Sequence, residues 1–174
     1  MRQPAKITIE DINSLGPGQF ATLLGGVFEN SPWVAEEAWS RRPFSSVEEL
    51  HGAMCAVVQL AGVERQEKLI NAHPDLVGSA ARLGTLTPES AREQSSAGLD
   101  RLSAEEISQF EKLNKAYRDK FGFPFVICVR ENKKDAVIEG FSYRISNSRE
   151  DEVERALEEI AKIARLRLME LIEG

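Results

Sequence analysis

The sequence predicts an all-α fold, a compact single-domain bundle of helices with one short extended segment near residues 125–129. Three observations lead to this prediction. Apolar residues recur along most of the chain at the three- and four-residue spacing of one helix face. Capping residues and glycines stand where these runs begin and end. The length of 174 residues suits one domain, here 1–174.

The first half of the chain contains two well-defined helical runs. Ser46 and Glu49 form a capping box ahead of an apolar periodic run, so we expect a helix over about residues 46–60. The run "VERQEKLINAHP" has a second apolar face and ends at Pro74, because the residue before a proline disfavours the α conformation. His73 is therefore expected at the end of a helix.

Two further helices have clear starts and ends. Thr87 is suited to cap the first of them, and Gly98 closes it. Ser103 and Glu106 form a capping box for the second, in which apolar residues recur at helical spacing until Gly122. This second run has the most regular helical pattern in the chain.

The C-terminal run "REDEVERALEEIAKIARLRLMELI" predicts a long helix that packs across the rest of the domain. Asn147 and Ser148 are its candidate caps, and acidic residues crowd its first turn, as the helix dipole favours. Its inner face is expected to consist of apolar residues, namely Val153, Leu157, Ile160, Ile163 or Ala164, and Leu168.

The run "FPFVICVR" breaks the helical pattern. It is a continuous stretch of β-branched and aromatic residues after Gly122 and Pro124, too short for a helix of its own. By composition it is a core element. Its main-chain N–H and C=O groups at 125–129 must then pair with another strand, with water or with a ligand.

Charge and hydropathy exclude some classes of partner. The net charge is -6, and the basic residues are scattered among acidic ones, so no nucleic acid is expected. No run approaches the roughly 18 to 20 apolar residues that cross a bilayer, so no membrane is expected either. The N-terminal residues lack an apolar signal segment and the C-terminal "LIEG" is not a peroxisomal address. We therefore expect a cytoplasmic protein.

Neither metal nor disulfide chemistry is expected from the cysteines. Cys55 and Cys128 both lie in apolar runs, with no second cysteine or histidine at the spacing of metal ligands. Buried thiols that act as small hydrophobic side chains are the better interpretation.

The chain has two histidines, and each has an ordinary structural interpretation. His51 falls in the middle of a helix among apolar residues, which is typical of a helix-surface or partly buried histidine. His73 near a helix C-terminus interacts well with the helix dipole. The following Pro74 fixes the backbone at His73, however, and histidine is the side chain best suited to exchange protons near neutral pH.

Polar side chains share one face of the helix that begins at Pro88. Ser90, Glu93 and Gln94 lie at i, i+3 and i+4. The face is either solvated or a set of groups able to recognise a small polar heterocycle. Arg144, in "YRISN", is likewise either a surface charge or a group that holds a carboxylate with two hydrogen bonds.

Taken in order, these segments resemble a known family. The strings "NAHPDL", "LTPESAREQSSAGLDRL", "LNKAYRDKFGFPFVICVR", "YRISN" and "EIAKIARLRL" look like those of the OHCU decarboxylases, where OHCU is 2-oxo-4-hydroxy-4-carboxy-5-ureidoimidazoline. The resemblance is close from about residue 60 to 172. Residues 1–60 match mainly in helical pattern and in "SPWVAEEAW".

The resemblance implies an enzyme of urate catabolism, a carboxy-lyase that converts OHCU to (S)-allantoin and CO2 without metal or cofactor. It also implies an all-helical homodimer, with a possible association with hydroxyisourate hydrolase. On this resemblance His73 is the catalytic proton donor and Glu93 the second catalytic group. The implied substrate-binding residues are Pro74, Ser90, Ala91, Arg92, Glu93, Gln94, Phe125, Val126, Ile127, Cys128, Val129 and Arg144.

One departure from the expected pattern precedes Arg144. Gly140 stands inside an expected helix, at a cost of about 1 kcal/mol relative to alanine, and bears on how Arg144 is oriented. Two other interpretations stay open. In the first, the chain is a helical interaction module that lacks the activity. In the second, it is a decarboxylase of a related ureido or imidazoline acid.

Overall fold

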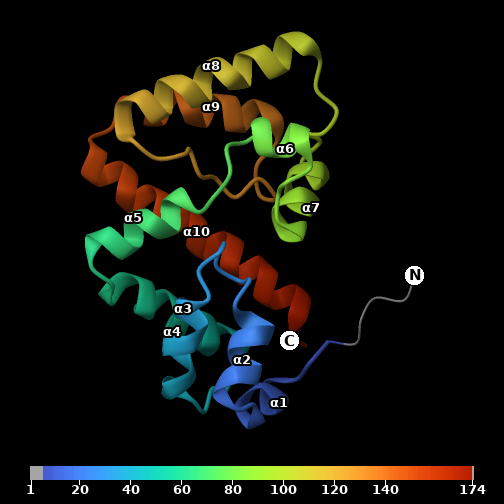
Figure 1. The fold of residues 1–174 in the computed structure, drawn as a ribbon, viewed down its shortest axis with the longest axis vertical. Coiled ribbons are helices and arrows are strands. Elements are labelled where there is room, and N and C mark those ends of the chain that lie inside the picture. The colour runs from blue at the N-terminus through green and yellow to red at the C-terminus, as the bar shows by residue number, and fades with distance from the viewer. Residues whose placement is uncertain (1–5, 174) are drawn as a thin grey trace. The chain divides into compact units, whose positions relative to one another are not determined.

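The computed structural model describes residues 6–173, and these residues are helical without a β-strand element (Figure 1). The all-α prediction is confirmed. The elements are α1 (Ile9–Ser14), α2 (Pro17–Leu24), α3 (Trp33–Ala38), the 3-10 helix η1 (Trp39–Arg41), α4 (Val47–Leu60), α5 (Val63–Asn71), α6 (Ser79–Leu83), α7 (Pro88–Ser96), α8 (Ala104–Phe121), α9 (Lys134–Arg144) and α10 (Arg149–Leu171). None of these helices is long and apolar enough to cross a membrane.

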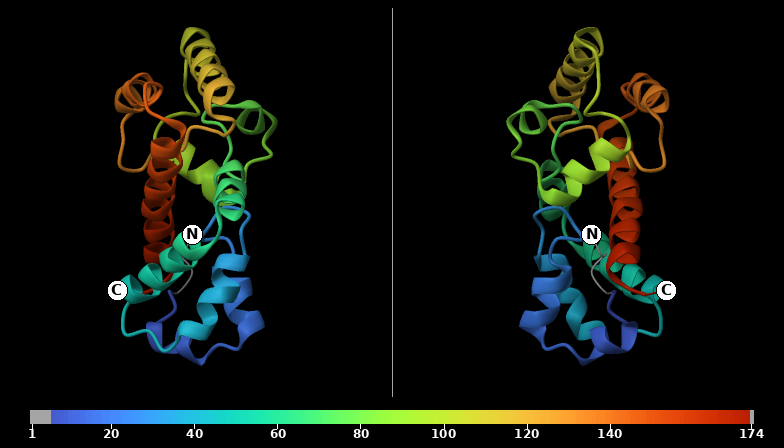
Figure 2. Two further views of the ribbon diagram at one scale, coloured as in Figure 1. Left: turned by 90° about the vertical axis from the view of Figure 1, so that its left-hand side faces the viewer. Right: turned by 90° about the vertical axis from the view of Figure 1, so that its right-hand side faces the viewer.

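The described chain divides into two compact units. The first contains the residues up to Ala72 together with those from Ala161 onward, and the second contains His73–Ile160. Helix α10 is one continuous helix, as Figure 2 shows, and contributes residues to both units. All predicted site residues from His73 to Arg144 belong to the second unit. That the whole chain forms a single domain stays a prediction.

In the first unit, α3 contacts α2 and α4. The buried side chains of α2 and α4 include Phe20, Leu24 and Met54. A buried ion pair between Arg167 and Glu29, with 2.8 Å between nitrogen and oxygen, also belongs to this unit. His51 is half-buried, as expected, and its Nε2 lies 2.8 Å from the carbonyl oxygen of Ala161.

Most helix ends follow the predicted capping chemistry, and one differs. Ser103 and Glu106 form a reciprocal capping box at the start of α8, which Gly122 ends with a φ of 81°. At α4, Ser46 Oγ accepts a hydrogen bond from Glu49 N. The Glu49 carboxylate, however, accepts from the backbone and hydroxyl of Ser45 instead of from the Ser46 N–H. The predicted box at Ser46 is therefore only half formed.

The second unit has an aromatic core beneath α8. Helix α8 contacts α9, and the chain that connects them contains no helix (Figure 1). Tyr117 on α8 packs edge-on against Phe125 of this chain, with ring centroids 5.2 Å apart. Phe125 stacks on Phe141 of α9 at 3.8 Å. On the inner face of α8, Asn114 is buried, whereas Leu113 is half-buried.

Gly140 has a packing reason in α9. A Cβ atom at this position would lie 3.3 Å from Cζ of Phe125 and 3.5 Å from Cδ1 of Ile127. The glycine therefore lets the extended segment approach the helix closely. Glycine is therefore favoured at this position by the close contact, although it costs some helix propensity relative to alanine.

The inner face of α10 differs from the predicted apolar stripe. Val153 and Leu157 are only half-buried. Two acidic residues, Glu152 and Glu159, are 0% and 1% exposed instead. Ile160, Ile163, Ala164 and Leu168 are buried as predicted. Because a buried carboxylate needs partners that neutralise and hydrogen-bond it, these two residues mark a polar network inside the second unit.

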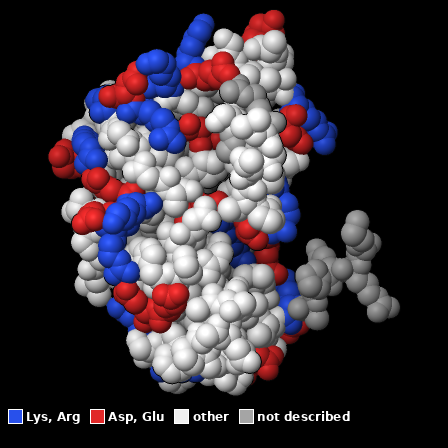
Figure 3. Space-filling model, in the orientation of Figure 1, with Lys and Arg blue, Asp and Glu red and all other residues white. Residues whose placement is uncertain are grey.

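Charges are intermixed on the face of the protein drawn in Figure 3. On the face drawn in Figure 3, basic and acidic side chains alternate without forming a continuous basic stripe. This distribution agrees with the scattered basic residues of the sequence and the net charge of -6.

Candidate functional site

His73 lies in a loop that follows the last turn of α5. Its side chain is only 6% exposed, and Pro74 beside it is half-buried. The placement of His73 at a helix terminus is confirmed, since α5 ends at Asn71 with Ala72 as its C-cap. A histidine that is largely withdrawn from water, on a backbone restricted by proline, has the setting expected of a group that must hold one orientation.

Two side chains fix the loop after His73. The N–H of Val77 donates a 3.1 Å hydrogen bond to Oε1 of Gln94 on α7. The amide of Asn114 on α8 donates to the carbonyl oxygen of Leu76 at 2.8 Å. Both bonds are buried, so the loop is tied to two helices where water does not compete.

An ion pair is the third attachment of this loop and the second that links it to α8. Nε of Arg118 lies 2.8 and 3.0 Å from the two carboxylate oxygens of Asp75. A Cβ at Gly78 would come within 2.8 Å of Cβ of Asp75, so glycine permits the tight turn that follows. The segment from His73 to Gly78 is thus held at several successive residues.

The predicted polar face of α7 is largely buried. Ser90 is 5% exposed and Gln94 is 6% exposed, while Glu93 is half-buried. The interpretation of this face as solvated is therefore wrong for Ser90 and Gln94. Ala91 and Arg92 are exposed, so their side chains lie on the other side of the helix. Through Gln94, this face adjoins the loop that carries His73.

The segment 125–129 is buried and lies outside any helix, with a turn beginning at Val129, and protein side chains bind parts of its main chain. Nη1 of Arg144 donates to the carbonyl oxygen of Val126 at 2.7 Å. The N–H of Cys128 donates to Oε2 of Glu159 at 2.9 Å. These partners differ from the strand, water or ligand that the sequence suggested.

Arg144 is buried, which makes the interpretation as a surface charge wrong. Its side chain is 5% exposed, its Nε lies 3.2 and 3.0 Å from the two oxygens of Glu152, and its Nη2 lies 2.9 Å from Oε2. The guanidinium also lies 4.4 Å from the ring centroid of Phe125. Arg144 does hold a carboxylate with two nitrogens, and this carboxylate is the protein's own.

Glu152 has further partners besides Arg144. It accepts hydrogen bonds from the hydroxyl of Tyr117 and, at 2.8 Å, from the amide of Asn147. Burial, followed by the hydrogen bond to Glu152, raises the pKa of the Tyr117 hydroxyl above its usual value. Tyr117 therefore stays protonated and donates to the carboxylate at all physiological pH values.

The two cysteines are free thiols. Cys128 is buried as expected, whereas Cys55 is half-buried. Burial raises the pKa of both thiols to about 11. Both are therefore protonated near neutral pH, which agrees with a packing role. In residues 6–173, no three His, Cys, Asp or Glu side chains form a group that could hold a metal ion.

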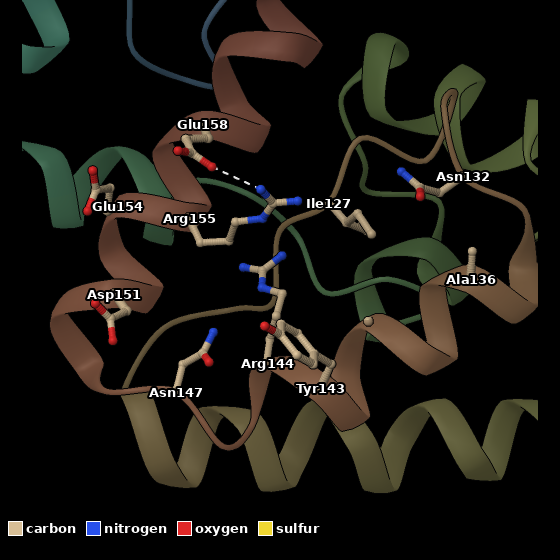
Figure 4. Close-up of a pocket in the computed structure, with 11 residues that line it drawn as sticks. Ile127, Asn132, Ala136, Tyr143, Arg144, Asn147, Asp151, Glu154, Arg155 and Glu158 are labelled. Atoms are coloured by element: carbon tan, nitrogen blue, oxygen red, sulfur yellow. Dashed lines mark hydrogen bonds and ion pairs between the residues drawn. The ribbon is translucent and has the colours of Figure 1, made fainter.

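Two hollows open beside the extended segment in the second unit. One, of about 490 Å³, is lined by Ile127, Arg144 and the first turns of α10 (Figure 4). The other, of about 530 Å³, is lined by Ala97 at the end of α7 and by residues 129–134. Because the end of α7 and Val129 both line the second hollow, α7 lies next to the end of the extended segment. Neither hollow is lined by His73 or Glu93, so their joint role stays a prediction.

Comparison with known proteins decides the family. The model of the family described as OHCU decarboxylase matches residues 13–169. The chain belongs to the OHCU decarboxylase family. A curated relative from Halalkalicoccus jeotgali, named 2-oxo-4-hydroxy-4-carboxy-5-ureidoimidazoline decarboxylase, is 43% identical over 166 residues, which cover 95% of this chain and 92% of the relative.

Two other relatives of this OHCU decarboxylase family member are longer proteins. A uric acid degradation bifunctional protein from Bacillus sp. (strain TB-90) is 42% identical over 94% of this chain and 32% of its own length. A crystal structure of (S)-allantoin synthase superposes with a TM-score of 0.78 and 31% identity, covering 96% of this chain and 54% of that chain.

In this OHCU decarboxylase family member, sequence reasoning missed Glu152 and Glu159. They lie seven positions apart on α10, or about two helical turns, and on the same face as the buried Ala156 and Ile160. This shared face is the signal that could have identified them, because a charged residue in an otherwise apolar stripe is usually paired.

Proposed function

We propose that this chain decarboxylates OHCU to (S)-allantoin and CO2 in urate degradation. The observation that carries the proposal is the 43% identity to a decarboxylase of that name over 95% of the chain. The buried His73, on a loop tied to α7 and α8, supports it from the structure.

The chemistry needs orientation and one proton. When the bond to the carboxylate carbon breaks, CO2 leaves and the electron pair moves toward the adjacent C=N group, which gives an enediamine-like intermediate. The nitrogen of that group takes up a proton. A second proton, delivered from one face to the adjacent ring carbon that bears the ureido group, gives one enantiomer of allantoin, while the hydroxyl on the carbon that lost CO2 releases its proton and becomes a carbonyl. We assign this delivery to His73, because a positioned histidine transfers protons near neutral pH. The ring's own C=N group accepts the electrons, so the proposal needs no cofactor.

The remaining predicted residues are assigned to substrate binding, except Arg144, whose side chain is bound to Glu152 and to the Val126 carbonyl oxygen. Ser90 and Gln94 on the buried face of α7, and Pro74 beside His73, suit contact with a polar heterocycle. Ala91 and Arg92 belong to the proposed segment through their backbone, since their side chains are exposed. A third wall would be formed by Phe125, Val126, Ile127, Cys128 and Val129, through the main-chain groups other than the Val126 C=O and the Cys128 N–H, which side chains already bind.

A direct assay tests the activity. OHCU is generated in situ from urate, the protein is added, and the circular dichroism of allantoin is followed. We expect a rapid signal of the S enantiomer. Racemic product at the spontaneous rate would contradict the proposal and favour a non-catalytic helical module. Turnover of a related ureido or imidazoline acid in place of OHCU would identify the other alternative.

Replacing Glu93 by glutamine should lower kcat/KM for OHCU by about 100-fold, the lower end of what an acid–base group contributes. The substitution keeps the shape of the side chain and removes its charge. Glu89→Gln is the matched control, because Glu89 lies one turn earlier on α7 and pairs at 3.5 Å with the exposed Arg92. Normal turnover by Glu93→Gln would reduce Glu93 to a residue of the binding face.

The assembly and location of the protein are also proposals. The bifunctional relative from Bacillus sp. supports an association with a second enzyme of urate degradation, for which hydroxyisourate hydrolase is our candidate. We further propose a cytoplasmic homodimer. Sedimentation of the purified protein, alone and with the hydrolase, tests the dimer and the association.

A further inference from the structure

The extended segment 125–129 is held in place without a partner strand. In the part of the chain that the structure describes, no strand pairs with it. Two groups on the second unit's helices bind it instead, Arg144 at the carbonyl of Val126 and Glu159 at the N–H of Cys128. Both bonds are buried and both involve a charged side chain, which makes them stronger than neutral hydrogen bonds.

The two anchoring side chains are themselves fixed. Arg144 is held by Glu152, which also accepts from Tyr117 and Asn147. Glu159 pairs with Nη2 of Arg155 at 2.9 Å. Figure 4 shows Arg144 and Arg155 reaching from α9 and α10 toward the segment that carries Ile127. Since each anchor has its own partner, the segment cannot shift without breaking its buried hydrogen bonds to Arg144 and Glu159.

The two anchors bind main-chain groups on one edge of the segment. The direction of the main-chain groups along an extended chain determines which N–H and C=O groups lie on the opposite edge. Residues 125–128 form neither helix nor turn, and in an extended chain the main-chain groups of successive residues point to opposite edges. Val126 and Cys128 are bound on the edge facing Arg144 and Glu159. The N–H and C=O of Ile127, between them, therefore point to the opposite edge. Gly140 contacts the side chains of Phe125 and Ile127 together, as this alternation requires.

We propose that Glu159, together with the Arg144–Glu152 pair, positions this segment so that Ile127 presents its main-chain N–H and C=O to the substrate. A donor and an acceptor from one residue match the paired C=O and N–H of a ureido or lactam group. The inference rests on the proposed function. It makes Glu159 and Arg144 positioning residues that act through Val126 and Cys128.

Substitutions of Glu159 with side chains of similar size test the role. Glu159→Met removes the acceptor for the Cys128 N–H and keeps the volume, whereas the amide oxygen of Glu159→Gln still accepts. Arg155 retains Glu158 as a partner in both variants, at 2.9 Å. Glu158→Gln is the matched control, because Glu158 binds the same arginine and is exposed.

We expect Glu159→Met to raise KM for OHCU by about tenfold, the effect of one well-placed hydrogen bond. The pH profile of kcat should keep its shape, because His73 is unchanged. Glu159→Gln should restore most of the affinity, and Glu158→Gln should match the wild type. Equal losses in the Met and Gln variants, or none in either, would overturn the proposal.

Amide hydrogen exchange in the wild-type protein gives a second test that needs no variant and no turnover. The Cys128 amide should exchange slowly in the free protein, and the Ile127 amide faster. Addition of (S)-allantoin should slow exchange of the Ile127 amide and leave exchange of the Cys128 amide unchanged. Equal protection of both amides in the free protein would refute the alternation. Racemic product from the wild type would instead refute the proposed function, and leave the exchange of the free protein as the test of the anchors.

Discussion

His73→Asn should abolish the enzymatic formation of (S)-allantoin, leaving the spontaneous reaction and its racemic product. Asparagine occupies the buried position and retains hydrogen-bonding groups, but it cannot donate a proton near neutral pH. General acid–base groups contribute roughly 10²- to 10⁴-fold, and we expect a loss in this range or greater. Circular dichroism of the product measures it directly.

The other histidine provides the control for this result. His51 lies in the first unit, where its Nε2 is 2.8 Å from the Ala161 carbonyl oxygen and 3.3 Å from Sγ of Cys55. His51→Asn should therefore retain the activity. Far-UV spectra of both variants should match that of the wild type. A fully active His73→Asn variant with a native spectrum would remove His73 from its proposed role.

Glu152→Leu should lower the free energy of unfolding by roughly 3–5 kcal/mol, the usual effect of removing one partner from a buried ion pair. Glu152 is 0% exposed and accepts hydrogen bonds from Tyr117, Arg144 and Asn147. Leucine leaves the guanidinium of Arg144 buried without its carboxylate. Urea unfolding followed by circular dichroism measures the change.

A control substitution at a nearby acidic residue of α10 distinguishes the effect of the buried Glu152 network from the effect of removing any negative charge. Glu154 on α10 is exposed, so Glu154→Leu should change stability by less than about 0.5 kcal/mol. A second substitution, Arg144→Met, should restore part of the stability of Glu152→Leu, because no unpaired charge then remains buried. Equal stability of Glu152→Leu and the wild type would show that the network contributes nothing to folding.

The helices could be predicted because their ends depend on local chemistry. Ser103 and Glu106 satisfy each other's backbone groups within a few residues, and Gly122 ends α8 with a positive φ. Such signals are contained in adjacent residues and need no knowledge of the fold. The incomplete box at Ser46 has an equally local cause, since the neighbouring Ser45 competes for Glu49.

Burial of charged and polar side chains could not be predicted in the same way. Arg144 finds Glu152 eight residues later, and Cys128 finds Glu159 only when α10 packs against the extended segment. The periodicity of α10 favoured Val153 and Leu157 for its inner face, because a carboxylate is expected in water unless a partner is known. The partners are set by tertiary packing.

The candidate site was predicted as separate segments, and the structure joins some of them. Gln94 ties the face of α7 to the loop that follows His73, a contact across seventeen residues that no local pattern reveals. Val129 and Ala97 line a common hollow, so the extended segment adjoins the same helix. The roles proposed for these residues come from the resemblance, since spacing alone also suits a solvated face.

A crystal structure of the wild-type protein with (S)-allantoin bound tests the central claim most directly. The account predicts that the ligand contacts the side chain of His73, the face of α7 at Ser90 and Glu93, and the main chain of Ile127. A ligand seated instead in the hollow lined by Arg144 and Arg155, away from His73, would contradict it.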